Sequence, residues 1–322
     1  MSDERDLSQR ILLGFSKLNY TFDVYENYPR VYYRLSKLLP PAGVVFQEFD
    51  LDTRIGCEVL CAAICHSINW DFLRKKIKSK TLNDITWLIP HHLSYITCND
   101  IEALLKEYNK KEYIRAAERS LLLANIGKRL YKDKMSYEDL FFTSGFLRDY
   151  DEIKSLVFRL DAFSSDPAEK KFRLLIQSVS DYQEMKVLSN YFEPTIDYHV
   201  TRLYIRRGVI HPIRKDAVEF LLNEDIVHRE STVGAIRMVC SESMKDISWL
   251  TLIDIKTVSR IEWWVARTVC VNGKPDCYLK SKDAEWVRNG FDKCPFYNIC
   301  EARNGLNIFL NIDEPKYGGN SY

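Results

Sequence analysis

The chain has 322 residues, 46 of them lysine or arginine and 45 aspartate or glutamate, with six histidines and nine cysteines. This length allows one large domain or two intertwined ones, and the balanced charge excludes neither a nucleic-acid nor a protein partner. The opening residues, MSDERDLSQR, lack the apolar run of a secretory signal, and no stretch reaches the roughly eighteen apolar residues of a membrane helix. We therefore expect an intracellular protein, in the cytoplasm or nucleoid, with no membrane partner.

Apolar residues recur at helical spacing along most of the chain. In chain order, the predicted helices cover residues 56–78 with a break at 67–69, then 97–106, 113–130, 136–144, 149–160, 166–179 and 198–208. The sequence Cys98-Asn99-Asp100 predicts the cap of the second helix, and Asp166-Pro167 predicts the start of the sixth. Alternating strand patterns are absent from the sequence, which predicts an all-α fold with few or no long strands.

Four cysteines near the C-terminus have a spacing that suits metal binding. Cys270 and Cys277 form C-x6-C, a sixteen-residue spacer follows, and Cys294 and Cys300 close the segment as C-P-F-Y-N-I-C. Thiolates are preferred ligands for soft metal centres, and four of them can surround a tetrahedral zinc or a four-iron cluster. The alternative is four buried thiols, since free cysteine behaves as a small hydrophobe.

The cysteine segment resembles the iron-sulfur lobe of the endonuclease III branch of the helix-hairpin-helix DNA glycosylase superfamily. The family spacing C-x6-C-x2-C-x5-C is matched in its first and last intervals, while the middle interval is longer by fourteen residues. Upstream, residues 192–209 (FEPTIDYHVTRLYIRRGV) are similar to the family signature D-x-H-V-x-R-x-x-x-R-x-G. The resemblance implies a 4Fe-4S cluster as cofactor, with zinc as the alternative. It also implies a two-lobed helical fold, with a barrel domain at 50–185 and a cluster-bearing domain made of 1–49 and 186–322.

Within the signature, the family aspartate falls on Asp197. A carboxylate there can stabilise the positive charge that develops on the sugar as an N-glycosidic bond breaks, and it can orient the attacking water. On local sequence, Asp197 is equally well explained as an ordinary helix N-cap. Arg202, on the following helix, is interpreted as a structural or phosphate-contacting residue and is assigned to the substrate-binding set. The resemblance adds His66, Ser67 and Asn69 to that set, because the matching polar turn of the family lies near the opened base pair.

The hairpin that binds a DNA phosphate in this family is altered. In place of L-P-G-V-G-x-K the chain has FSSDPAEK at residues 163–170, which lacks both glycines and places Asp166 where a phosphate would dock. Lys170 is the nearest counterpart of the lysine that attacks the sugar in strand-cutting members, and Lys171 follows it. Lys170 is therefore a candidate catalytic residue, although hydrolysis without strand cutting is the expected activity.

Together these features predict a monomeric DNA glycosylase-like enzyme that releases a damaged or modified base. Three alternatives stay open: the same chemistry on RNA or a modified nucleoside, a non-catalytic nucleic-acid or protein-binding module on the same scaffold, and a zinc protein unrelated to glycosylases. The sequence does not identify the base.

Overall fold

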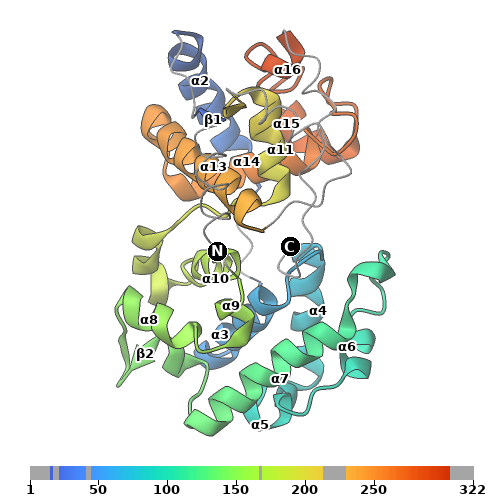
Figure 1. Cartoon of the computed structure of the whole chain (residues 1–322), viewed down its shortest axis with the longest axis vertical. Coiled ribbons are helices and arrows are strands. Elements are labelled where there is room, and N and C mark those ends of the chain that lie inside the picture. The colour runs from blue at the N-terminus through green and yellow to red at the C-terminus, as the bar shows by residue number, and fades with distance from the viewer. Residues whose placement is uncertain (1–14, 17–21, 41–44, 167–168, 213–229, 305–322) are drawn as a thin grey trace. The chain divides into compact units, whose positions relative to one another are not determined.

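The computed structural model describes residues 15–16, 22–40, 45–166, 169–212 and 230–304 (Figure 1). Helices account for 65% of the structure and strands for 2%, which confirms the all-α class. Within the described ranges, every helix is too short or too polar to cross a lipid bilayer. The contacts divide the chain into two units: unit 1 takes Met1–Pro41 and Glu193–Gly319, and unit 2 takes Ala42–Phe192 and Asn320–Tyr322. The sequence predicted junctions close to these, at 49/50 and 185/186.

Unit 2 is built around the buried helix α3. The elements of this unit are α3 (Leu51–Ala63), α4 (Trp70–Asn83), η1 (Ile85–Leu88), α5 (Pro90–Leu93), α6 (Cys98–Leu104), η2 (Lys111–Tyr113), α7 (Ala116–Asp133), η3 (Glu138–Leu140), β2 (Phe142–Thr143), β3 (Phe146–Leu147), α8 (Tyr150–Val157), α9 (Asp161–Ser164), α10 (Lys170–Val179) and η4 (Gln183–Tyr191). Asp50 caps α3 by accepting the Thr53 amide at 2.8 Å. Ten of its thirteen residues are buried, and α10 and α4 pack against it. A helix that is apolar on nearly every side belongs at the centre of a core.

Several predicted boundaries in unit 2 are confirmed or shifted by local capping. The predicted break near residues 67–69 is confirmed, since α3 ends at Ala63 and α4 begins at Trp70. The predicted Cys98 cap was wrong by one residue: Thr97 caps α6 in a reciprocal capping box with Asp100. The helix predicted from Tyr113 begins only at Ala116, because Arg115 adopts a left-handed conformation with φ 42°.

The helix predicted at residues 136–144 was wrong. The chain forms the short η3 turn there and then the two-stranded hairpin β2–β3. Ser144 and Gly145 connect the strands with φ values of 51° and 80°. Two successive residues with positive φ make the tight turn that suits the twist of a hairpin, and helical periodicity does not detect this.

Unit 1 is a helical bundle that contains the signature helix and the cysteines. Its elements are β1 (Phe15–Ser16), α2 (Phe22–Leu38), α11 (Tyr198–Arg207), β4 (His211–Pro212), α13 (Glu230–Thr251), α14 (Ile255–Thr268), η5 (Lys282–Ala284), α15 (Glu285–Arg288) and α16 (Glu301–Asn304). Helix α11 packs against α13, α14 and α16, and α2 packs against α13 and α14 (Figure 1). Gly208 ends α11 with φ 75°, a left-handed conformation that favours glycine, and a Cβ there would meet the Glu301 carboxyl group.

A buried ion pair joins three helices of unit 1. Arg207 of α11 donates to Glu262 of α14 at 2.6 Å and to the Tyr32 hydroxyl of α2 at 3.1 Å. The Arg207 guanidinium also lies 3.7 Å from the centre of the Phe296 ring. Because Glu262 and Tyr32 are fully buried, removing one charge of the pair leaves the other without compensation.

We expect Glu262→Gln to lower the free energy of unfolding by about 3 kcal/mol, because Arg207 then stays buried without a countercharge. The double variant Arg207→Met/Glu262→Gln removes both charges and should be less destabilised than Glu262→Gln alone. Denaturant unfolding of the wild type, the two single variants and the double variant measures this difference. A double variant as unstable as the sum of the two single substitutions would show that the charges are not coupled.

Candidate functional site

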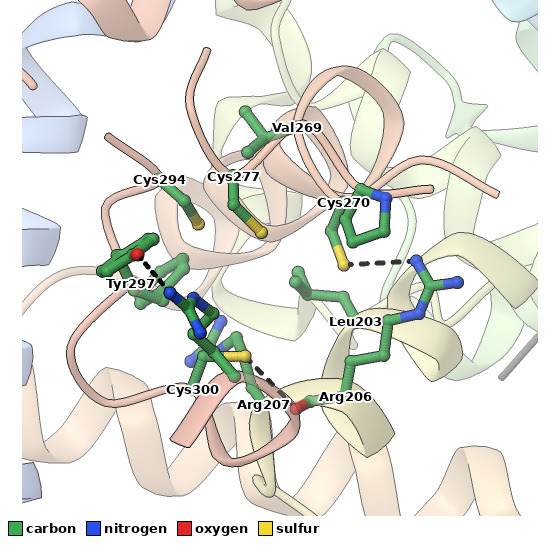
Figure 2. A pocket seen from close by; sticks show the side chains of 12 residues that line it. Leu203, Arg206, Arg207, Val269, Cys270, Cys277, Cys294, Tyr297 and Cys300 are labelled. Atoms are coloured by element: carbon green, nitrogen blue, oxygen red, sulfur yellow. Dashed lines mark hydrogen bonds between the residues drawn. The ribbon is translucent and has the colours of Figure 1, made fainter. Parts of the chain in front are cut away.

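Four thiols surround one pocket in unit 1. Cys270 follows the end of α14, Cys277 and Cys294 flank the sixteen-residue spacer, and Cys300 directly precedes α16. All four line the same pocket, and Figure 2 shows their sulfur atoms facing it from different sides, with Arg206 at its edge. The structure thus brings together the four residues predicted as metal ligands.

The long spacer does not separate its flanking cysteines. The backbone N–H of Cys294 donates to the carbonyl oxygen of Cys277 at 2.9 Å, so the loop begins and ends at the same place. Inside the loop, α15 packs against α2, and the Trp286 indole donates to the Thr268 hydroxyl at 2.9 Å. The added residues therefore form a closed loop, and Cys277 and Cys294 remain next to each other. This agrees with the slow growth of the entropic cost of loop closure with loop length.

Helix α11 forms one wall of the four-thiol pocket, and two of its arginines, one turn apart, bind the segment around Cys270. Arg202 is fully buried and donates to the carbonyl oxygens of Cys270 and Ala266, both at 3.0 Å. Arg206 donates to the carbonyl of Val271 at 2.7 Å and contacts the Cys270 sulfur at 3.7 Å (Figure 2). In return, the Cys300 thiol donates to the Arg206 carbonyl at 3.3 Å.

Arg202, assigned to the substrate-binding set from the sequence, is fully buried in the structure. Its guanidinium contacts backbone carbonyls and His199, whose Nδ1 lies 3.1 Å away. Arg202 thereby holds the segment that follows α14 against α11. This corresponds to the structural role that the sequence left open.

Three thiols of the pocket, those of Cys277, Cys294 and Cys300, favour the protonated form. Burial raises the pKa of Cys277 and Cys294, and it raises that of Cys300 to about 11, with the neighbouring thiols adding to each shift. Metal binding there therefore has to release protons. No group of three or more His, Cys, Asp or Glu side chains is arranged to hold a metal ion in the part of the chain that the structure describes.

Asp197 begins α11 in the N-cap position. Its Oδ1 accepts the backbone N–H of Val200 at 3.0 Å, and the residue is 8% exposed. The interaction is that of an N-cap, the second of the two roles open from the sequence. It also fixes the orientation of the carboxylate at the start of the helix that forms the pocket wall.

The predicted substrate-binding turn of unit 2 has mixed roles. Asn69 is the N-cap of α4, with its side-chain oxygen accepting the Phe72 amide at 3.0 Å. The Ser67 backbone is left-handed at φ 57°, and its carbonyl accepts from the Tyr108 hydroxyl at 3.4 Å. The Asn69 side chain therefore stabilises the turn. Of the three residues, His66 is the one whose pKa is strongly shifted.

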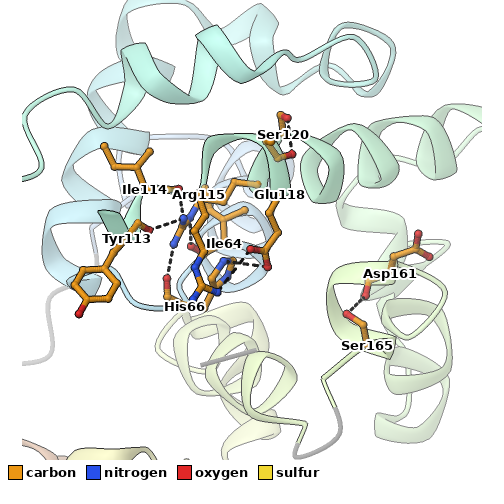
Figure 3. Close-up of polar contacts among 11 residues, drawn as sticks. Ile64, His66, Tyr113, Ile114, Arg115, Glu118, Ser120, Asp161 and Ser165 are labelled. Atoms are coloured by element: carbon orange, nitrogen blue, oxygen red, sulfur yellow. Dashed lines mark hydrogen bonds and ion pairs between the residues drawn. The ribbon is translucent and has the colours of Figure 1, made fainter. Parts of the chain in front are cut away.

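His66 is buried, and its Nε2 faces the Glu118 carboxylate (Figure 3). Burial, followed by the charges of Arg119, Lys171, Arg115 and Lys170, lowers the pKa of His66 to about 2. The imidazole is therefore neutral, so the 3.4 Å approach of its Nε2 to Glu118 is not an ion pair. Neither ring nitrogen has a hydrogen bond within the described residues.

Arg119 anchors the turn that carries His66. It is fully buried, and its guanidinium donates to the carbonyls of Ile64 at 3.1 Å and Tyr113 at 2.8 Å, and also to those of Ile114 and His66 (Figure 3). Sequence reasoning missed Arg119, because its position on α7 has no motif. Its importance comes from carbonyls of segments distant in sequence.

The two candidate lysines at the start of α10 differ in environment. Lys171 is buried at 2% exposure, and this burial lowers the pKa of its amine, while Lys170 is partly exposed. Asp166 Oδ2 accepts the backbone N–H of Lys171 at 2.7 Å. The N-cap position of α10 belongs to Glu169, so the predicted helix start at Asp166-Pro167 was wrong by three residues, and Pro167 lies outside the described residues. Of the two lysines, the geometry favours Lys171 as a reactive amine, since a desolvated amine is more readily neutral.

No family model matches the chain, and the curated proteins include no significant match to it.

Proposed function

We propose that the protein is a base-excision N-glycosylase, acting on DNA, in which Asp197 stabilises the oxocarbenium-like transition state. The observation that carries the proposal is that α11 forms a wall of the four-thiol pocket. Two separate stretches of sequence resemble the same superfamily, the signature that opens at Asp197 and the cysteine segment. The bonds from Arg202 and Arg206 to the chain around Cys270 join these stretches in one structural element.

The chemistry assigned to Asp197 follows from its charge and its fixed orientation. As the glycosidic bond breaks, the sugar becomes positively charged, and a nearby carboxylate lowers the energy of that state. The Val200 amide holds the Asp197 carboxylate at the start of α11, which limits the reorganisation that the reaction requires. The second oxygen of a carboxylate can orient water for attack on the sugar.

The donor set at the pocket fits a 4Fe-4S cluster held by Cys270, Cys277, Cys294 and Cys300. A single tetrahedral zinc needs its sulfur ligands within about 4 Å of one another, because each Zn–S bond is about 2.3 Å long. In a four-iron cluster each thiolate binds a different iron, so the ligands stand farther apart. Four thiols that line one pocket supply the ligands of either group, and the resemblance of the cysteine segment favours the cluster over zinc. When bound, the group would cross-link the segments that carry the four cysteines.

Asp166 favours a second candidate substrate, RNA or a modified nucleoside. Its buried carboxylate occupies the start of α10 by accepting the Lys171 amide, and this is where the family docks a DNA phosphate. A carboxylate in that position repels a phosphate. The same observation, together with the capping role of Asp197, also suits a non-catalytic nucleic-acid-binding module.

The proposal is tested on anaerobically purified protein in two steps. Iron, sulfide and zinc are quantified first, with four irons and four sulfides per chain expected. The protein is then incubated with DNA duplexes, single strands, RNA and nucleosides that carry damaged or modified bases, and released base is measured. Release from none of these substrates would reject the enzyme, and one zinc without sulfide would reject the cluster.

We expect any strand-cutting activity to depend on Lys171 and not on Lys170. Attack of a neutral amine on the sugar forms an imine that borohydride reduces to a stable cross-link. Lys171→Gln should abolish the cross-link, while Lys170→Gln should retain it. Because burial lowers the pKa of Lys171, the yield should rise as the pH increases through that lowered value and level off above it. Equal loss in both variants would contradict this assignment.

A further inference from the structure

A surface patch of two tyrosines and two cations lies beside the four-thiol pocket. Tyr278 and Lys293 are the first and last residues of the spacer, Tyr297 lies between the last two cysteines, and Arg303 is on α16. We call these four residues the tyrosine-cation patch. Tyr278 is 53% exposed, and Lys293 and Arg303 are also exposed.

The patch holds its cations in defined positions. The two tyrosine rings meet edge to face at 5.8 Å, and their hydroxyl oxygens are 3.2 Å apart. The Lys293 ammonium lies 4.7 Å from the centre of the Tyr297 ring and 5.8 Å from that of Tyr278. The Arg303 guanidinium lies 4.9 Å from the Tyr297 ring and donates to its hydroxyl at 2.7 Å. Cation-π contacts of this kind restrain side chains that otherwise move freely in solvent.

The charges of the patch have no acidic partner within the described residues. No carboxylate there forms an ion pair with Lys293 or Arg303. By contrast, Lys245 in the same unit contacts two carboxylates, those of Glu193 and Glu242. Two restrained positive charges next to tyrosine hydroxyls therefore face solvent and are available to an anion from outside the protein.

We propose that the tyrosine-cation patch binds the phosphodiester backbone of a nucleic-acid strand. Lysine and arginine neutralise phosphates, and tyrosine hydroxyls donate hydrogen bonds to phosphate oxygens. The surface is polar and cationic, which suits a phosphate backbone and not an apolar protein face. This inference extends the proposed function by naming a contact surface for its partner, but it concerns binding and does not require base release.

The patch and the four-thiol pocket share structural elements. Tyr297 and Arg303 line the pocket as well as forming the patch (Figure 2 labels Tyr297), and the spacer that ends in Tyr278 and Lys293 is closed by the hydrogen bond between Cys277 and Cys294. Nucleic-acid affinity should therefore depend on the order of the cysteine segment. On this proposal the spacer contributes to nucleic-acid binding, in addition to leaving the four cysteines in place.

The test measures binding of a short, fluorescein-labelled duplex of mixed sequence, and of its single strand, by anisotropy across a range of salt concentrations. All proteins carry Asp197→Asn, so that catalysis does not contribute. Removing one phosphate contact should reduce the magnitude of the slope of log K against log salt by about 1. The gain in affinity between 1 M and 0.1 M salt should then be about tenfold smaller than for the parent protein. We expect this for Lys293→Gln and for Arg303→Gln, and about twice the effect for the double variant.

Lys282→Gln is the matched control, because Lys282 is an exposed lysine of the same spacer outside the patch. It should leave the slope nearly unchanged. Equal slopes for all variants, or an equal loss for Lys282→Gln, would overturn the inference, the latter by showing that only net charge matters. Polyglutamate that competes as well as the oligonucleotide would also overturn it, by indicating an acidic protein partner. If the wild type releases no base but the patch variants change the salt slope as expected, the enzymatic proposal is rejected and the binding proposal for the patch stands.

Discussion

Asp197→Asn should lower the rate of base release by about 10²–10³-fold, the cost typical of losing one preorganised electrostatic group in an active site. The amide is neutral and cannot compensate the positive charge that builds up on the sugar. The fold should not suffer, because asparagine is as good an N-cap as aspartate and can accept the same Val200 amide. Single-turnover release rates, with the free energy of unfolding of the same variant, check both parts.

Asp254→Asn provides the control for this experiment. Asp254 caps α14 in the same unit by accepting the Thr257 amide at 2.9 Å, so the substitution makes the same chemical change at an equivalent cap. It should leave base release unchanged. If Asp197→Asn also leaves release unchanged on a substrate that the wild type cleaves, Asp197 is only a cap.

Cys294→Ala should remove the metal and lower the free energy of unfolding by at least about 3 kcal/mol, because the energy of metal binding at such sites is also folding energy. Cys294 is the proposed ligand at the point where the spacer returns to the pocket, and its backbone closes the spacer onto Cys277. The loss should appear as reduced bound metal, reduced absorbance of the metal-thiolate bands and a lower unfolding midpoint. Nucleic-acid affinity should fall in parallel, since the tyrosine-cation patch is part of the same segment.

Cys240→Ala separates loss of a ligand from loss of a buried thiol. Cys240 is fully buried on α13 in the same unit and does not line the four-thiol pocket. Its substitution removes a similar volume and should leave the metal content at the wild-type value. A Cys294→Ala protein that keeps its metal and stability would show that the four cysteines are only packed thiols.

The candidate site was predictable in part, because residue type and neighbouring sequence identify some of its residues. The four cysteines were found by residue type and spacing, and Asp197 was found because a cap is defined by the few residues that follow it. Lys171 could not be ranked above Lys170 from sequence, since their difference is burial, and burial depends on how α10 packs on α3. The burial of Arg202 could not be predicted for the same reason.

The tyrosine-cation patch had no signal in the sequence. Its four residues lie at the two ends of a spacer, between two cysteines and on α16, and no motif connects them. The hydrogen bond between Cys294 and Cys277 brings the ends of the spacer together and so creates the patch. A surface made by loop closure becomes visible only once the closure is known.

The sequence by itself determined the helical class, the positions of several helices and the grouping of four cysteines, because periodicity, caps and ligand spacing act over short stretches of chain. It misjudged the hairpin at residues 142–147, where two positive φ values override a helical pattern. Only the tertiary structure decided that α11 lines the four-thiol pocket, that Arg202 is buried and that burial and nearby cations lower the pKa of His66. These properties depend on burial and on charges from distant segments, and no local pattern encodes them.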